Sequence, residues 1–201
     1  MKIGPKFKIA KRLGAPIYEK TQTQKFALSE ARTGRARKRF SKPSDYKRQL
    51  NEKQKMRLTY GLSEKQFRRY VDTAMEKSNK PTEHLYSRLE NRLDNIIYRA
   101  GFAKTRRLAR QIVSHGHITL NGKKMNIPSH EVKVGDVVSV RESSNDSALF
   151  TDMDDRHEMA SVPVWLKVDV KKLSATVDGA PVFNQTEAYF DPEQVLEYYS
   201  R

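Results

Sequence analysis

The spacing of apolar residues changes at Gly116, and this change limits the fold more than any other feature of the chain. Before Gly116, apolar residues recur at intervals of three and four, which is the period of an α-helix. After it, alternation begins at Ile118 and Leu120 and leads into Asn121-Gly122, a strong signal for a tight hairpin. The pattern predicts helices followed by a small, mostly antiparallel sheet, and therefore an α+β fold.

Four helices are predicted before the change of period. A side chain suited to the N-cap position begins each of them, and the cap residues are Ser44, Ser63, Thr82 and Thr105. The predicted ranges are 44–60, 63–78, 82–100 and 105–115. After the hairpin, residues 137–140 and 164–168 read as strands, and residues 192–199 read as a short helix. Residues 142–161 are polar and acid-rich and are expected to form a loop or a weak helix.

The charge of the chain is concentrated at one end. Residues 1–70 hold 21 basic and 5 acidic residues, for a net charge of +16, and residues 71–140 add a net +5. Residues 141–201 carry a net −6. Nucleic acid is the first partner that such a charge predicts, and an anionic membrane surface is the second. Because one end attracts phosphate and the other repels it, a uniformly basic tail is excluded.

Several classes of protein are excluded by what the sequence lacks. The chain has no cysteine, so it has no disulfide, no thiolate nucleophile and no cysteine-ligated zinc. No stretch of about 18 apolar residues predicts a membrane span, and the first residues do not resemble a secretory signal. No phosphate-binding loop or dinucleotide fingerprint is present. A soluble cytoplasmic protein without a metal or cofactor is expected.

The segment from Thr105 to Ser114 carries the clearest binding chemistry. On a helix, Arg106, Arg107 and Arg110 lie on one side, and the apolar residues between them face the other side. Guanidinium groups match phosphate oxygens and stack on bases, and the helix N-terminus adds amide donors. Lys104 precedes the helix, and Lys123 and Lys124 follow the hairpin turn. The alternative interpretation is a solvated basic face.

Two sets of motifs resemble known families. The stretches 92–99, 105–118 and 121–122 resemble the S-four RNA-binding domain, which also occurs in RNA-modifying enzymes and some tRNA synthetases. The flanking residues resemble the S-four family of bacterial small-subunit ribosomal proteins. They are Gly4-Pro5-Lys6, Tyr46, Gln49, Leu50, Glu52-Lys53-Gln54-Lys55, Arg57, Tyr60-Gly61, Gln66-Phe67-Arg68, Pro163-Val164-Trp165-Leu166 and Glu197-Tyr198-Tyr199-Ser200.

The resemblance implies a fold, a function and a set of partners. The implied domains are a basic extension at 1–43, a helical domain at 44–91 completed by 170–201, and an inserted RNA-binding domain at 92–169. The implied function is to bind a multi-helix junction of small-subunit rRNA early in assembly, without catalysis. The implied partners are entering mRNA, ribosomal protein S-five and other small-subunit proteins. Through S-five the protein is implied to affect decoding accuracy. Repression of its own mRNA is also implied, and no homo-oligomer is expected.

The residues expected to contact RNA are basic, apart from one cap residue. They are Lys6, Lys8, Arg12, Arg35, Arg37, Lys47, Lys53, Lys55, Arg57, Arg68, Arg69, Arg92, Lys104, Thr105, Arg106, Arg107, Arg110 and Lys123. Arg37, Lys38, Arg39 and Lys42 form a further run of charge, which we place at the mRNA entrance. Some family members hold zinc with N-terminal cysteines, but residues 21–34 contain none, so zinc is not expected.

Two other functions compete with this interpretation. An RNA-modifying enzyme needs a catalytic domain, yet only about 60 residues follow Arg141, without a nucleophile–base pair. A helix-turn-helix DNA regulator could use residues 82–116, but the hairpin and the basic N-terminus argue against it. His115 and His117 are expected to end a helix rather than bind metal. The acidic residues at 152–158 lack the spacing of a calcium loop.

Overall fold

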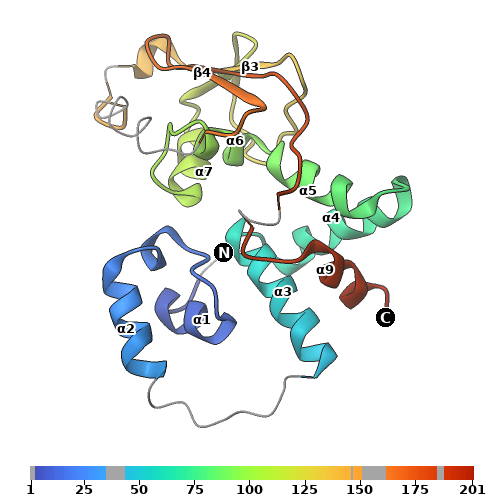
Figure 1. The fold of residues 1–201 in the computed structure, drawn as a ribbon. Coiled ribbons are helices and arrows are strands. Elements are labelled where there is room, and N and C mark those ends of the chain that lie inside the picture. Colours follow the sequence, from blue (N-terminus) through green and yellow to red (C-terminus); the bar gives the residue numbers. More distant parts are fainter. Residues whose placement is uncertain (1–2, 35–43, 146, 151–161, 185–187) are drawn as a thin grey trace. The chain divides into compact units, whose positions relative to one another are not determined.

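The computed structural model describes residues 3–34, 44–145, 147–150, 162–184 and 188–201 (Figure 1). The chain divides into two compact units. Residues 1–85 and 183–201 form the first, here called the helical unit, and residues 86–182 form the second, the sheet unit. The helical unit is therefore made of two chain segments, with the sheet unit inserted between them.

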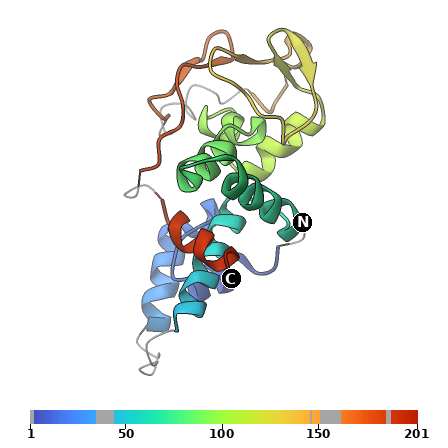
Figure 2. The same cartoon turned by 90° about the vertical axis from the view of Figure 1, so that its right-hand side faces the viewer.

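The helical unit has helices from both of its segments. They are α1 (Lys6–Leu13), η1 (Glu19–Thr21), α2 (Gln24–Gly34), α3 (Asp45–Thr59), α4 (Glu64–Lys77), the first half of α5 (Pro81–Glu90) and α9 (Pro192–Tyr199). Figure 2 shows α9 beside α3, although about 140 residues separate them in the sequence. Phe67, Val71 and Ala74 of α4 and Val195 of α9 are fully buried. The C-terminal helix thus completes the core of this unit.

The caps predicted for α3 and α4 are confirmed. The Ser44 hydroxyl accepts a hydrogen bond from the backbone N–H of Lys47, which satisfies a free donor at the start of α3. Ser63 and Gln66 form a reciprocal capping box at the start of α4. Between the two helices, Gly61 adopts a left-handed conformation with φ of 62°, which allows the sharp reversal.

The expectation of an extension at the N-terminus is wrong for residues 6–34. Phe7 of α1 and Phe26 of α2 meet edge to face with their ring centroids 5.2 Å apart. The Lys11 ammonium donates hydrogen bonds to the carbonyl and the hydroxyl oxygen of Ser29, so it also joins the two helices. Leu13 and Tyr18 pack against Leu58 of α3. The apolar residues look scattered in the sequence because α3 completes their packing.

The sheet unit is built from the second half of α5 and from α6 (Leu93–Arg99), α7 (Arg106–Ser114) and five antiparallel strands. The strands are β1 (Ile118–Leu120), β2 (Lys123–Met125), β3 (Val137–Val140), β4 (Leu166–Asp169) and β5 (Ser174–Val177), and η2 (Glu142–Ser144) follows β3. Their order across the sheet is β2-β1-β3-β5-β4. In Figure 1, α6 and α7 lie together on one face of this sheet. Buried residues of α6, α7 and the strands form one core.

The hairpin predicted at Asn121-Gly122 is confirmed. Leu120 pairs with Lys123 across the turn, and Ile118 pairs with Met125. Asn121 and Gly122 both have positive φ, at 49° and 77°, which is the geometry that suits the twist of a two-residue hairpin. The strand predicted at 137–140 is β3, whereas β5 was not predicted from the sequence.

The helix predicted at 82–100 is two helices. The break falls at Asn91 and Arg92, where the backbone pairs with a distant segment instead of continuing the helix. The N–H of Val132 donates to the carbonyl of Asn91 at 2.9 Å, and the N–H of Leu93 donates to that of His130 at 2.9 Å. Moreover, α5 begins at Pro81, so Thr82 lies within the helix and does not cap it.

The limits of the inserted unit also differ from the expected ones. The sequence placed its end at residue 169, but β5 pairs with both β3 and β4, which keeps the chain in the sheet unit as far as Val182. Its start lies within α5, between Leu85 and Tyr86, rather than at residue 92. The sheet therefore needs a longer insertion than the resemblance implied.

Candidate nucleic-acid interface

Helix α7 presents a basic face backed by a packed apolar one. Thr105 caps the helix as predicted, since its hydroxyl accepts a hydrogen bond from the N–H of Leu108. Ala109, Ile112 and Val113 are buried in the core of the sheet unit. Arg107 on the opposite side is exposed, and Arg106 and Arg110 are partly exposed. The helix can therefore hold three guanidinium groups toward a ligand while its other side stays packed.

Two of these arginines are held by residues of α6. The Nε of Arg106 donates to the side-chain oxygen of Asn95 at 2.9 Å, and its guanidinium lies 4.3 Å from the ring centroid of Tyr98. The Nε of Arg110 donates to a carboxylate oxygen of Asp94 at 2.7 Å. In the sequence, Asp94 is a lone carboxylate in an arginine-rich stretch, which predicts either an ion pair or a backbone cap, and the structure shows the ion pair. The roles of Asn95 and Tyr98 were not predicted. The available signal was that Asp94 and Asn95 stand between the apolar residues Leu93 and Ile96.

The hairpin brings a lysine to the end of α7. Gly116, which ends the helix, has a φ of 75°, and a Cβ built on it would lie 2.4 Å from the Cε of Lys124. The Lys124 side chain therefore passes directly over this glycine. Lys123, which the sequence predicts to contact RNA, is exposed at the neighbouring strand position. A cation near the C-terminal end of a helix is also favourable to the helix dipole.

The remaining predicted contacts differ in their exposure. Lys8, Arg12, Lys47, Arg69 and Lys104 are exposed, as is Arg68, which pairs loosely with Asp72 at 3.7 Å. Lys6 is partly buried, with its ammonium 5.3 Å from the ring centroid of Tyr18. Arg35, Arg37, Lys38, Arg39 and Lys42 lie outside the described residues.

Two of the predicted contacts are buried, and the structure does not favour direct binding by them. Lys53 is 6% exposed and pairs with Glu64, and Arg92 is 4% exposed and pairs with Asp94. Lys55 and Arg57 are also mostly covered, because Lys55 pairs with Glu52 at 2.6 Å and Arg57 binds Gln54 and the carbonyl of Leu62. A basic side chain predicts phosphate binding only while it is exposed, and contacts within the unit cover these four side chains.

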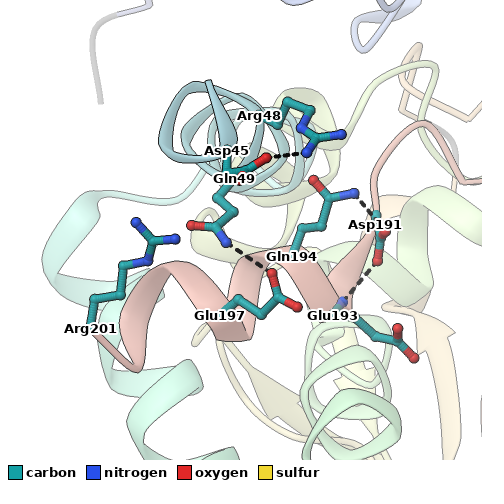
Figure 3. A pocket seen from close by; sticks show the side chains of 8 residues that line it. All are labelled: Asp45, Arg48, Gln49, Asp191, Glu193, Gln194, Glu197 and Arg201. Atoms are coloured by element: carbon teal, nitrogen blue, oxygen red, sulfur yellow. Dashed lines mark hydrogen bonds and ion pairs between the residues drawn. The ribbon is translucent and has the colours of Figure 1, made fainter. Parts of the chain in front are cut away.

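A separate groove of about 440 Å³ lies between α3 and α9 in the helical unit (Figure 3). Its residues include four carboxylates and two arginines, and they are Asp45, Arg48, Gln49, Asp191, Glu193, Gln194, Glu197 and Arg201. The Gln49 amide donates to Glu197 at 2.9 Å, Gln194 donates to Asp191 at 3.0 Å, and Arg48 pairs with Asp45. The excess of carboxylates makes this groove unsuited to phosphate and suited to a basic protein surface.

Comparisons with known proteins also divide the chain, and the two matched families meet between residues 90 and 91, next to the start at residue 92 that the sequence predicts. The family described as "Ribosomal protein S4/S9 N-terminal domain" matches residues 1–90, and the family described as "S4 domain" matches residues 91–138. The small ribosomal subunit protein uS4 of Chromobacterium violaceum is 41% identical over 202 residues, which cover 99% of this chain and 98% of that protein. This chain belongs to the uS4 family. The resemblance seen in the sequence is thereby confirmed.

Other members of the family are similar over much of their length. The small ribosomal subunit protein uS4 of Chloroflexus aurantiacus is 42% identical over 203 residues, which cover 99% of this chain and 98% of that protein. That of Corynebacterium kroppenstedtii is 46% identical over 168 residues, or 84% of this chain and 82% of that protein. Proteins of this family are structural components of the ribosome and not enzymes, so the alternative of an RNA-modifying enzyme is set aside.

The described residues offer no other obvious site. None of their helices combines the length and the apolar character that crossing a membrane requires. Within the same ranges, His, Asp and Glu side chains nowhere form a group of three that could hold a metal ion. His117 accepts or donates a hydrogen bond to Ser144 at 3.0 Å, and His115 follows the end of α7, which fits the expected structural role. The acidic residues at 152–158 lie outside the described residues.

Proposed function

We propose that this protein is a structural component of the cytoplasmic small ribosomal subunit and binds small-subunit rRNA early in assembly. The observation that carries the proposal is the basic face of α7, where Arg106 and Arg110 are anchored and Arg107 is exposed, in a chain of the uS4 family. Phosphate contacts of this kind recognise the shape of an RNA helix, because the base edges of A-form RNA lie in a deep and narrow groove.

A clamp of two basic surfaces gives this binding a role in assembly. A multi-helix RNA junction offers several phosphate backbones at fixed angles, and exposed cations occur in both units, such as Arg12 on α1 and Arg107 on α7. If both surfaces bind only the folded junction, binding shifts the RNA toward that fold, because a ligand shifts a population through its differential affinity. No catalytic step is required.

The proposal is tested by comparing RNA with DNA. The full chain is titrated with a transcribed junction of small-subunit rRNA and with a DNA duplex of equal length, across a series of salt concentrations. We expect a strong preference for the RNA and a steep fall in affinity as salt rises, since each neutralised phosphate releases counterions. Equal affinity for both nucleic acids would contradict the ribosomal function and favour a DNA-binding one.

We also propose that the groove between α3 and α9 receives ribosomal protein S-five, the partner tied to decoding accuracy. The groove supports this because Glu193 and Glu197 are exposed on α9 and suit a basic partner surface. Glu193→Lys should weaken binding of S-five and leave rRNA affinity unchanged. Glu76→Lys on α4 makes the same charge change at an exposed position away from the groove and serves as the control. Equal losses from both variants would exclude the groove.

Two finer proposals concern mRNA. Arg37, Lys38, Arg39 and Lys42 are proposed to face entering mRNA, on the strength of their run of charge. Crosslinks from mRNA that consistently avoid residues 35–42 would contradict this.

Repression of the protein's own mRNA is the second proposal. It is tested by measuring whether added protein lowers translation of that message but not of an unrelated one.

A further inference from the structure

We infer that Asn95 and Asp94 are positioning residues, which orient the guanidinium groups of Arg106 and Arg110 for phosphate binding. This inference rests on the proposed rRNA-binding function. The two positioning residues are adjacent on α6, and the two arginines are four positions apart on α7, so they lie on the same side of that helix. Each arginine is held through its Nε, with distances of 2.9 Å to Asn95 and 2.7 Å to Asp94.

The amide of Asn95 can face only one way. Its nitrogen donates to the backbone carbonyl of Glu90 at 3.0 Å and to a carboxylate oxygen of Glu90 at 3.0 Å. Glu90 is fully buried and is bound by Arg99 through two nitrogens, which holds it in place. Because the backbone carbonyl of Glu90 only accepts and the Nε–H of Arg106 only donates, the Asn95 nitrogen must point toward Glu90, and its oxygen must point toward Arg106. Glu90 therefore determines that Asn95 presents an acceptor.

A second contact holds the Arg106 guanidinium. Its central carbon lies over the Tyr98 ring, 4.3 Å from the ring centroid, which is within the range of a cation–π pair. With Nε bound at Asn95 and the face covered by Tyr98, the direction of the guanidinium fork is set before a ligand arrives. A lysine in the same place could not be oriented by these two contacts.

The anchor of Arg110 is a carboxylate whose charge is compensated elsewhere. Arg92 binds both oxygens of Asp94, at 3.0 and 2.8 Å, and both residues are 4% exposed at their side chains. Arg92 thus balances the charge of Asp94, and the positive charge of Arg110 is not cancelled within the cluster of three. The side chain of Arg110 remains 32% exposed. Asp94, Arg92 and Arg110 together therefore carry a net charge of +1.

This arrangement has a defined consequence for affinity. An arginine that is already oriented loses less side-chain freedom on binding than a mobile one, and the difference amounts to about threefold to tenfold in affinity for each side chain. Removing a positioning residue should therefore reduce rRNA affinity even though that residue does not touch the RNA. A residue that only stabilises the unit should change the amount of folded protein and not the affinity of the folded fraction.

The test is a double-mutant cycle on the full chain with the transcribed rRNA junction as the probe. We expect Arg106→Ala to lower affinity by about tenfold and to make the salt dependence shallower by about one phosphate contact. Asn95→Ala should give the same kind of change at about threefold to tenfold. Asn95→Ala added to Arg106→Ala should cause no further loss, because the arginine that Asn95 orients is already gone. Val113→Ala, which removes buried apolar contacts from the other side of α7, should lower thermal stability without changing the salt dependence.

The outcomes separate the inference from the function on which it rests. If the wild-type chain does not prefer the rRNA, the proposed function fails. If it binds but Arg106→Ala has no effect, or if Asn95→Ala causes an equal loss in the presence and absence of Arg106, the positioning role is overturned while rRNA binding stands. The Asp94 arm uses Asp94→Asn, which keeps one acceptor for Arg110 and should retain more affinity than Asp94→Ala. Should the alanine variant fail to fold, the Asn95 cycle still decides.

Discussion

The ammonium of Lys53 and the hydroxyl of Tyr199 bind the same oxygen of Glu64, at 2.5 and 2.7 Å. Lys53 also lies over the rings of Tyr198 and Tyr199, with its Nζ 4.4 and 4.8 Å from the two ring centroids. These contacts join α3, α4 and α9, which belong to the two separate segments of the helical unit. Lys53 therefore helps to attach the C-terminal helix rather than to bind RNA.

Replacing Lys53 by methionine should loosen α9. The variant keeps most of the apolar stem but loses the ion pair and the two cation–π contacts, which are worth about 1 to 2 kcal/mol when partly desolvated. Amide hydrogen exchange in α9 measures this loss directly, and we expect faster exchange there than in β1 or β3. Lys65→Met, at an exposed position on α4, makes the same chemical change and should have little effect. Equal exchange in both variants would contradict the role of Lys53.

The same cluster predicts a dependence of stability on pH. Burial pushes the pKa of Glu64 upward, but hydrogen bonds from Lys53 and Tyr199 and the charges of Lys53 and Arg57 outweigh it, and the pKa lies below its ordinary value of 4.5. A carboxylate with a lowered pKa binds fewer protons in the folded chain than in the unfolded one. Its contribution is therefore complete above about pH 5 and is lost as the pH falls through 4.5 and below.

Glu64→Gln should remove this part of the acid sensitivity. Exchange in α9, measured at pH 6 and pH 3.5 and corrected for the intrinsic rate, should change less in the variant than in the wild type. Asp136→Asn is the matched control, because the pKa of Asp136 in the sheet unit is also lowered, by hydrogen bonds from the Lys133 amide and Asn121. It should alter acid sensitivity around β3 and not in α9. An unchanged response of α9 in Glu64→Gln would show that another carboxylate controls it.

Gly116→Ala should destabilise the sheet unit by about 1 to 2 kcal/mol, the cost of a left-handed backbone for a residue with a Cβ. The new methyl group would also displace the end of the Lys124 side chain, which is flexible and can move at low cost. Gly4→Ala is a suitable control, since the nearest atom to its added Cβ is 3.9 Å away and its φ is not positive. Thermal denaturation followed by circular dichroism compares the two, and equal melting temperatures would contradict the prediction.

Local sequence signals predicted the parts of the fold that depend on neighbours in the chain. Helix caps and tight turns depend only on residues a few positions away in the chain, so they could be predicted from the sequence. This applies to the caps Ser44, Ser63 and Thr105 and to the hairpin at Asn121-Gly122. The break at Arg92 could not, because it depends on backbone hydrogen bonds to residues about 40 positions away. The packing of residues 6–34 likewise depends on Leu58 of α3.

The same distinction applies to the candidate interface. Helical spacing placed Arg106, Arg107 and Arg110 on one side of α7, and the structure confirms this arrangement. Spacing could not distinguish an exposed cation from a buried one. Lys53 is covered because Glu64 and two C-terminal tyrosines meet it, and these partners come from other helices. Whether a charged side chain is buried depends on side-chain contacts between distant segments, and a single sequence does not show which segments will meet.

Arg107 provides the most direct test of the exposed face of α7. The residue is exposed at the start of the helix, so Arg107→Ala should change the free energy of unfolding by less than about 0.5 kcal/mol. If Arg107 neutralises one phosphate, the slope of log affinity against log salt should become less negative by about one.

Lys167→Ala is the matched control for this measurement. Lys167 lies on β4, at the other edge of the sheet from the hairpin, is 76% exposed and pairs with Asp178 at 2.5 Å. The substitution Lys167→Ala removes one positive charge from the same unit, so it tests whether the overall charge alone determines the salt dependence of binding. We expect its slope to match that of the wild type, because a charge that does not neutralise a phosphate releases no counterion. Equal slopes for the two variants would mean that the whole surface, and not the face of α7, attracts the RNA.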